Sequence, residues 1–228
     1  MARSDYQPYW NKNIEKWAEL YLDISHGHET YDAAPWFSKL YASTLGRVER
    51  NLMKQRYART ISFLDKHLKP GATVSDIGCG TGIFVVEALR RGARVNAIDF
   101  APRALEITRI NVARYFTSAA VDYYQLDVQQ QRLPRSDVAI AMGVTPYLAD
   151  LAAFLGNALP TTRLFYCLYV DGKHWANRLR SGLPFLNVRR LRFYSREEID
   201  NIYRRHGYRL LERTKFATGF IDLARISS

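Results

Sequence analysis

The sequence has few cysteines and no long apolar run. Its 228 residues include two cysteines, Cys79 and Cys167, too few for a disulfide framework and without the spacing of zinc ligands. The longest apolar stretch, Leu164 to Val170, has the length of a strand, whereas a membrane-spanning helix needs about 20 apolar residues. The first residues, 1–6, lack the apolar core of a signal peptide. These absences predict a cytoplasmic protein with no disulfide framework, no membrane span and no metal site.

Acidic residues are fewer than basic ones. The chain has 33 Lys and Arg against 22 Asp and Glu, a net charge of +11. From Asp171 onward, 13 basic and 6 acidic residues give 13 − 6 = +7. Such a bias favours an anionic substrate, a nucleic acid or a membrane surface as partner, or else simply a basic soluble surface. The 47% hydrophobic content predicts a globular core, in one large domain or one domain with an extension.

Three alternating glycines form the most informative stretch of the sequence. The run Asp76-Ile77-Gly78-Cys79-Gly80-Thr81-Gly82 follows a short apolar strand and precedes an apolar-periodic helix at 83–91. Glycine adopts backbone angles that other residues resist, and it lets a ligand approach the main chain closely. The pattern predicts a strand, a tight ligand-binding turn and a helix.

An acidic residue follows the glycines at a defined spacing. Asp99 ends a second apolar strand at 94–98, and it lies 99 − 82 = 17 residues after Gly82. In a strand–turn–helix–strand unit this carboxylate lies beside the turn, where it can accept hydrogen bonds from a ribose. Three interpretations are open: a dinucleotide site, whose third glycine would replace Ile83, an S-adenosylmethionine (SAM) site, or a helix-capping loop without ligand.

The remaining chain alternates strands and helices, which predicts parallel strands joined by right-handed crossovers. After residue 195 the pattern changes to one helix at 197–206, with Ser195 as its N-cap, and a terminal hairpin. We therefore predict an α/β fold, a doubly wound, seven-stranded, mostly parallel sheet with a C-terminal antiparallel hairpin. The expected strands are 73–77, 94–98, 121–126, 138–142, 163–170, 208–215 and 220–226, and the expected central helices are 81–91, 102–114 and 147–159.

The segment before the first strand is expected to be helical. Apolar spacing predicts helices at 9–22, 34–45 and 47–68. We assign residues 1–69 to an N-terminal arm or lid and 70–228 to the ligand-binding domain. Within that domain, 172–192 is expected to be an insertion on the substrate side.

The glycine turn and the acidic strand ends resemble those of class I SAM-dependent methyltransferases, over about residues 70–226. The resemblance implies SAM as the cofactor. It implies that Asp76 supports the turn and that Asp99 holds the ribose. It also implies that Phe100 flanks the adenine and that Asp127 binds the adenine amino group. For Asp127 the alternative is a loop carboxylate that caps a turn. The complete set of cofactor-contacting residues implied is Asp76, Gly78, Cys79, Gly80, Gly82, Asp99, Phe100, Asp127, Val128, Met142 and Tyr41.

A looser likeness extends to both ends of the chain. The stretch 36–41, an arginine-rich helix up to residue 59 and the ending Thr218-Gly219-Phe220 resemble magnesium-protoporphyrin O-methyltransferases and related small-molecule O-methyltransferases. By this likeness Tyr41 belongs to an arm that closes over the cofactor. It implies a small-molecule acceptor.

Candidate catalytic residues must follow the fourth and fifth strands, where open α/β sheets bind ligands. His174 is the expected general base because its ordinary pKa is near neutrality. Tyr147 is expected to position the acceptor. The stretch 142–147 lacks the D/N-P-P-Y/F/W motif that amino-methylating nucleic-acid enzymes share, which disfavours a nucleobase acceptor.

The stretch 175–192 interleaves five arginines with apolar residues and contains no acid. Arginine forks match carboxylates and phosphates, and an amphipathic basic segment can also contact a membrane surface. We therefore predict a SAM-dependent O-methyltransferase for an anionic, partly apolar small molecule. The alternatives are an RNA methyltransferase that uses the basic C-terminal surface, a non-catalytic SAM-binding protein, and a stretch 175–192 that is only a basic solvated lid.

Overall fold

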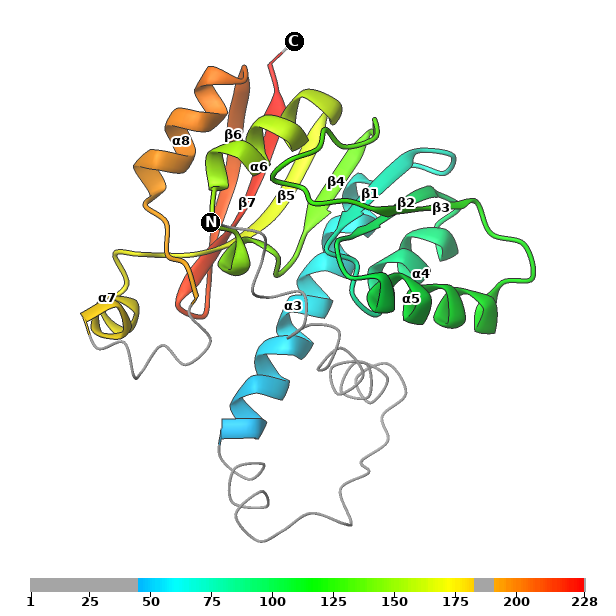
Figure 1. The fold of residues 1–228 in the computed structure, drawn as a ribbon, viewed down its shortest axis with the longest axis horizontal. Coiled ribbons are helices and arrows are strands. Elements are labelled where there is room, and N and C mark those ends of the chain that lie inside the picture. Colours follow the sequence, from blue (N-terminus) through cyan, green and yellow to red (C-terminus); the bar gives the residue numbers. More distant parts are fainter. Residues whose placement is uncertain (1–44, 183–190, 228) are drawn as a thin grey trace, which may run out of the picture.

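The computed structural model describes residues 45–182 and 191–227, and in this part of the chain seven strands form a single sheet (Figure 1). Its strand order is β3-β2-β1-β4-β5-β7-β6. Among these strands β7 is antiparallel to both of its neighbours, and the other pairings are parallel. The strands are β1 (Thr73–Ile77), β2 (Arg94–Asp99), β3 (Val121–Gln125), β4 (Val138–Ala141), β5 (Leu164–Val170), β6 (Tyr208–Phe216) and β7 (Gly219–Ile226).

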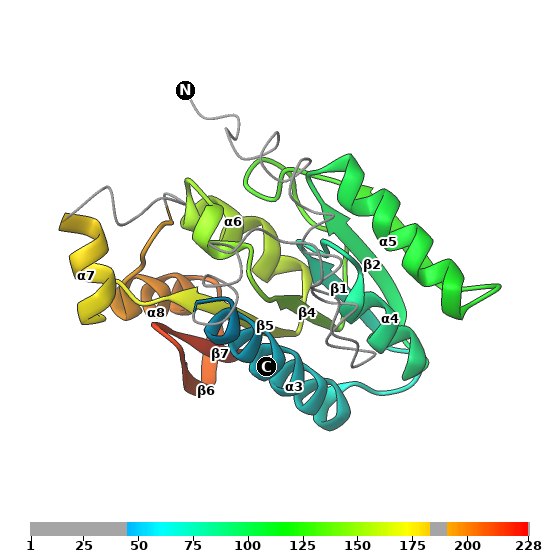
Figure 2. The same ribbon diagram turned by 90° about the horizontal axis from the view of Figure 1, so that it is seen from below.

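Helices cover both faces of the sheet (Figure 2). Side chains of α3, α4 and α5 form one core with one face, and side chains of α6 and α8 form a second core with the other. The helices are α3 (Leu45–His67), α4 (Ile83–Arg90), α5 (Pro102–Tyr115), α6 (Leu151–Ala158), α7 (Trp175–Gly182) and α8 (Arg196–Arg205), with short 3-10 turns η1 (Thr145–Tyr147) and η2 (Leu159–Thr161).

The central strands are apolar on both sides because helices cover both faces. In β5, Phe165 and Cys167 belong to the core under α6 and α8, and Leu164 and Leu168 belong to the core under α3 and α4. Strand β1 lies between β2 and β4, so the order of connection reverses there. Open α/β sheets bind ligands beyond the carboxyl ends of their strands at such a point, which places a site at the ends of β1, β2 and β4.

The predicted fold class is confirmed, and the predicted strands agree with the observed ones to within about one residue at each end. Ser195 is the N-cap of α8 as expected, since its side chain accepts a hydrogen bond from Glu198 N at 3.1 Å. Gly207 then ends the helix with a φ of +69°.

One predicted helix is wrong at its start. The apolar spacing predicts a helix over 147–159, but the chain makes the 3-10 turn η1 and then an extended stretch before α6 begins at Leu151. A side chain from another loop binds the backbone of this stretch and keeps it from becoming helical. Gln129 Oε1 accepts hydrogen bonds from the backbone N–H groups of Ala149 and Asp150, both at 2.8 Å. Asp150 then caps α6 by accepting from Ala153 N at 2.9 Å.

Of the expected N-terminal helices, 9–22 and nearly all of 34–45 lie outside the described residues, and α3 corresponds to the predicted helix 47–68. Phe63 and Leu64 of α3 are buried in the same core as β1 and α4. The domain boundary at 69/70 and the assignment of 172–192 as an insertion stay predictions. Among the described helices, none combines the length and apolar character required to cross a membrane.

Candidate cofactor site

The glycine turn connects β1 to α4 and requires glycine for its shape. Gly78, Gly80 and Gly82 have φ values of +70°, +56° and +76°, in the left-handed region that side chains disfavour. The turn is fixed to the neighbouring strand, because the N–H groups of Gly78 and Cys79 donate to Ile98 O of β2 at 2.8 and 3.0 Å. The main chain is thus exposed toward a pocket beyond the strand ends.

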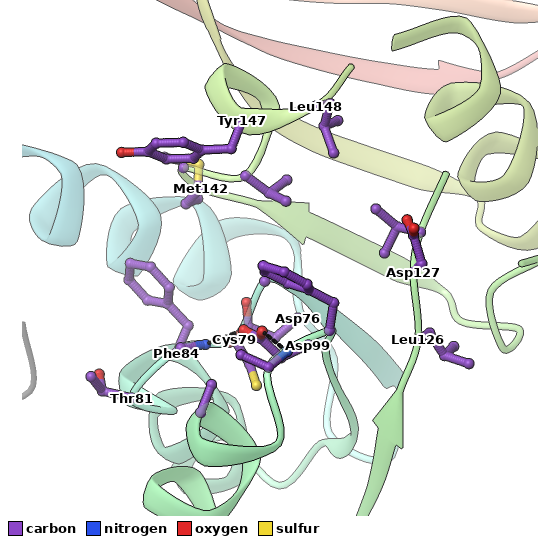
Figure 3. Close-up of a pocket in the computed structure, with 18 of the residues that line it drawn as sticks. Asp76, Cys79, Thr81, Phe84, Asp99, Leu126, Asp127, Met142, Tyr147 and Leu148 are labelled. Atoms are coloured by element: carbon purple, nitrogen blue, oxygen red, sulfur yellow. Dashed lines mark hydrogen bonds between the residues drawn. The ribbon is translucent and has the colours of Figure 1, made fainter. Parts of the chain in front are cut away.

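The pocket is lined by the ends of four adjacent strands and by α3 (Figure 3). Asp76 and Cys79 come from the end of β1, Asp99 from the end of β2, and Asp127 follows β3. Met142 follows β4, at the start of the loop that leads to η1. This pocket brings together most of the residues that the sequence pointed to.

Asp99 joins the turn to the next helix. Its buried carboxylate accepts hydrogen bonds from Gly80 N at 3.0 Å and from Ala101 N at 2.9 Å. Burial raises the pKa of Asp99 to about 6, and these backbone N–H groups oppose the rise. The carboxylate keeps free acceptor capacity toward the pocket, since each oxygen can accept more than one hydrogen bond.

Asp76 carries a polar atom that the described protein does not satisfy. Its Oδ2 atom is buried and has no hydrogen-bond partner among the described residues. Burial and the nearby Asp99 together raise the pKa of Asp76 to about 8, with Arg56 opposing the rise. Buried polar groups are normally paired, so this orphaned oxygen fits a ligand that brings a donor or a positive charge.

Arg56 is a site residue that the sequence analysis missed. It lies on α3, lines the pocket, and its Nη1 atom is 2.8 Å from the position that a Cβ on Gly143 would occupy. Burial lowers the pKa of Arg56 to about 10, and Tyr147 and Asp76 oppose the change, so the guanidinium stays charged near neutral pH. It is the one cationic side chain among the described lining residues. The arginine-rich helix was noted, but no local motif distinguishes this arginine from its neighbours.

One wall of the pocket follows β2 and β3. Phe100 and Val128 line it, and Figure 3 shows Asp127 on this side. Asp127 also caps its own turn, accepting from Gln129 N at 3.0 Å and from Gln130 Nε2 at 2.9 Å. The turn-capping role is therefore present in the structure, together with a place in the pocket lining.

The wall on the β4 side is formed by Met142, Gly143 and the turn η1. In Figure 3 the aromatic ring of Tyr147 lies beside Met142, across the pocket from Asp76 and Asp99. This wall combines a thioether, bare main chain and a phenol hydroxyl.

Two predicted site residues do not line the pocket, and a third lies outside the described residues. Gly82 is not part of the pocket lining; it packs against α5, where an added Cβ would lie 2.6 Å from Thr108 Cγ2. His174 does not line the pocket either. Its Nδ1 accepts from Ala176 N at 3.3 Å, and its ring lies 5.9 Å from that of Trp175. Tyr41 lies outside the described residues.

Comparisons with known proteins agree with this geometry. A profile of the methyltransferase domain family matches residues 50–213. The ribosomal protein L11 methyltransferase of Pelotomaculum thermopropionicum is 32% identical over 100 residues, which cover 43% of this chain and 32% of that protein. A second such enzyme, from Yersinia pseudotuberculosis, is 35% identical over 106 residues, 46% of this chain and 36% of that protein. The chain thus spans about a third of the length of the curated relatives it matches.

Among solved structures, magnesium protoporphyrin IX methyltransferase from Synechocystis PCC 6803 with bound S-adenosylhomocysteine (SAH) superposes with a TM-score of 0.72 at 17% identity, covering 97% of both chains. The N-methyltransferase NodS from Bradyrhizobium japonicum, in complex with SAH, has a TM-score of 0.60 at 15% identity and covers 95% of this chain and 100% of its own. These likenesses confirm the predicted fold. The match over 50–213 covers most of the chain, and the chain therefore belongs to the methyltransferase domain family, with the fold of the class I SAM-dependent methyltransferases.

Proposed function

We propose that this methyltransferase transfers the methyl group of SAM to an oxygen of a small, anionic, partly apolar acceptor. The observation that carries the proposal is the composition of the carboxyl edge of the sheet. There the pocket with its glycine turn and acids lies next to η1, and η1 is hydrogen-bonded to the basic segment that follows α7. We therefore propose that the stretch around Arg192 selects the acceptor beside the cofactor pocket.

The residues of the pocket offer partners for each part of the cofactor. Gly78 and Gly80 expose main chain for the amino-acid part, and Arg56 would pair with its carboxylate. Asp99 would accept from the ribose hydroxyls. The remaining wall would hold the adenine, and the residues that form it are Phe100, Asp127 and Val128.

The acceptor would approach from the side of η1 and α7. Arg192 N donates to Pro146 O of η1 at 2.8 Å, and the Tyr194 hydroxyl donates to Thr145 O at 2.9 Å. On α7, Trp175 is 74% exposed and Leu179 is 49% exposed, one helical turn apart. This exposed apolar surface, together with the exposed Arg178 and Arg192, fits an acceptor that has an apolar body and a negative group.

Bound SAM supplies an electrophilic methyl group and leaves as neutral SAH. The protein has to align the acceptor oxygen with the S–CH₃ bond, and alignment alone can contribute several kcal/mol. A carboxylate acceptor needs no base, whereas a hydroxyl acceptor must lose its proton as the O–C bond forms. Tyr147 lines the pocket, and its proposed role is to orient the acceptor.

Tyr147→Phe is expected to lower turnover by about tenfold without changing SAH affinity, because only the hydroxyl that orients the acceptor is removed.

His174→Ala tests the base predicted from the sequence. Since His174 does not line the pocket, we expect the turnover of the His174→Ala variant to stay close to that of the wild type. Initial rates with labelled SAM and calorimetric SAH affinities measure both effects. Wild-type rates for Tyr147→Phe, with a large loss for His174→Ala, would assign the chemistry to His174 instead.

Cofactor affinity should depend on pH through Asp76. Its pKa of about 8 means that the carboxyl of the ligand-free protein is mostly protonated at neutral pH. The cofactor's positive charge favours the carboxylate, so binding releases a proton and the affinity for SAH falls as pH decreases below about 8, by at most tenfold per pH unit for one proton. Below pH 6, Asp99 adds to this loss. Calorimetry of SAH between pH 6 and pH 8.5 checks the slope.

The control for this prediction is Asp76→Asn, which cannot ionise. Its SAH affinity should be nearly constant between pH 6.5 and pH 8.5. An equal slope in the variant and the wild type would show that another group is responsible for the pH dependence.

The acceptor class is tested by methyl transfer from labelled SAM into a fractionated cell extract. The proposal is supported if the label is found in the small-molecule fraction, in an acidic compound. Methylation should convert a carboxylate of this compound to a methyl ester or a hydroxyl to a methyl ether. The curated relatives methylate a ribosomal protein by their names, and the net charge of +11 keeps RNA as the second candidate. Label in protein or in RNA alone would contradict the proposal. A cytoplasmic location also stays a prediction.

A further inference from the structure

A second cavity lies between α3 and the terminal hairpin, and it shares no lining residue with the cofactor pocket. We call it the α3–hairpin cavity; its volume is about 290 Å³. One side is the face of α3 that carries Arg59, Phe63 and Lys66, whose spacing of three and four residues places them on one side of the helix. The other side is formed by β5 and by the hairpin strands β6 and β7, beside which α3 lies (Figures 1 and 2).

The charge of this cavity is mainly positive. Arg59 and Lys66 supply the positive charge, His67 adds to it only when protonated, and Glu212 is the acidic residue among the described lining. Arg59 is held in place, since its Nη1 donates to Lys215 O at 2.9 Å and its guanidinium lies 5.5 Å from the ring centre of Phe216. An ordered cation beside a flexible lysine is a common arrangement for binding phosphate or carboxylate.

The floor of the cavity is apolar and aromatic. The rings of Phe63 and Tyr166 stack with their centres 4.1 Å apart and their planes 4° apart. Ile221 and Leu223 of β7 are buried beside them. Burial raises the pKa of Tyr166 to about 12, with Glu212 adding to the rise and Arg59 opposing it, so its hydroxyl stays protonated and can donate a hydrogen bond.

We propose that the α3–hairpin cavity binds a small amphipathic anion, a phosphate or carboxylate attached to an aromatic or aliphatic body. The negative group would contact Lys66, Arg59 and His67, and the apolar body would lie on the Phe63–Tyr166 stack. This site lies outside the cofactor pocket and does not depend on which acceptor is methylated.

Binding should be linked to the protonation of His67. Burial lowers the pKa of His67; Lys66 on α3 and Arg225 on β7 lower it further, and Glu212 on β6 opposes them. Arg59 also lines the same cavity and adds positive charge. A bound anion offsets these positive charges, so it raises the pKa of His67, and anion affinity should increase as pH falls through the titration of this histidine.

The experiment uses the full chain saturated with SAH, so that anions cannot enter the cofactor pocket. The probes are phenyl phosphate, benzoate, inorganic phosphate and uncharged benzyl alcohol, titrated by calorimetry and by the imidazole proton resonances in NMR. The His67 resonance is assigned by its loss in His67→Gln. We expect phenyl phosphate and benzoate to bind and to move the His67 titration to higher pH, inorganic phosphate to bind more weakly, and benzyl alcohol to leave His67 unchanged.

Two charge-matched variants locate the site. Lys66→Glu should weaken the binding of phenyl phosphate by about tenfold or more, because the attraction between the lysine and the phosphate becomes a repulsion between two negative groups. Lys54→Glu makes the same change in net charge on α3 outside the cavity lining, and we expect less than about a twofold effect from it. Both lysines are exposed, so both variants should fold, and thermal melting checks this.

Equal losses in both variants would show that only net charge matters, and would overturn the site. An unshifted His67 with both organic anions would overturn it as well. If inorganic phosphate binds as tightly as phenyl phosphate, the amphipathic class is wrong. A protein that fails to bind SAH but still binds phenyl phosphate through Lys66 would contradict the cofactor-site assignment and leave this proposal standing.

Discussion

Gly82→Ala is expected to lower the free energy of unfolding by about 2–5 kcal/mol. Two terms add up: a left-handed φ costs a side chain about 1–2 kcal/mol, and overpacking a buried contact costs about 1–3 kcal/mol. The φ of Gly82 is +76°, and an added Cβ would lie 2.6 Å from Thr108 Cγ2 and 2.9 Å from its Oγ1. Thr108 cannot move away easily, because it is fully buried and its hydroxyl donates to Gly80 O at 3.1 Å. Urea unfolding measures the loss.

Gly207→Ala is the matched control for this prediction. Gly207 has a similar φ of +69°, but an added Cβ there would meet nothing within 4 Å. We expect a loss of only about 1 kcal/mol from the backbone term. Equal losses for the two variants would show that the contact with Thr108 is not what makes glycine necessary at 82. Because the clash displaces the turn that carries Gly80, Gly82→Ala should also weaken SAH binding, whereas Gly207→Ala should not.

Asp99→Ala is expected to weaken SAH binding by roughly 30- to 150-fold, from the loss of charged hydrogen bonds of about 2–3 kcal/mol. Two effects contribute. The carboxylate that would hold the ribose is removed, and the N–H groups of Gly80 and Ala101 lose their acceptor. The pocket would therefore lose a ligand contact and part of its preformed shape. Calorimetry with SAH at a constant pH of 8, for variant and wild type alike, measures the effect.

Two further variants separate those effects. Asp99→Asn keeps one oxygen acceptor, and its loss should be smaller than that of Asp99→Ala. Asp122→Ala removes an exposed carboxylate from the next strand, β3, and should leave SAH affinity unchanged. Wild-type affinity in Asp99→Ala, with the fold intact by circular dichroism, would exclude Asp99 from ribose binding.

The loop chemistry of the cofactor site could be read from the sequence because it depends on neighbours along the chain. Three alternating glycines predict a turn with left-handed backbone, and Gly78, Gly80 and Gly82 all have positive φ. The spacing to Asp99 predicts that its carboxylate lies beside the turn, and it accepts a hydrogen bond from Gly80 N. The strand–helix alternation likewise predicts the parallel sheet, since such strands need crossover helices.

Arg56 and the start of α6 could not be predicted in this way. Arg56 is 20 residues before the turn, on a helix whose other arginines follow no distinguishing pattern, and only the packing of α3 on the sheet places it over Gly143. The helix predicted at 147–159 was shortened by Gln129, whose side chain accepts from Ala149 N and Asp150 N across the end of the sheet. Local apolar spacing contains no information about a hydrogen bond from a distant loop.

The sequence by itself determined the order of strands and helices and the shape of the glycine turn, because hydrophobic period and backbone preference act over a few residues. The tertiary structure alone decided which charges meet. It brought Arg56 to Asp76, separated His174 from the pocket that Tyr147 lines, and assembled the α3–hairpin cavity from segments more than 150 residues apart, such as Arg59 on α3 and Thr214 on β6. Electrostatic interactions and burial depend on distance in space, and a linear pattern does not specify that distance.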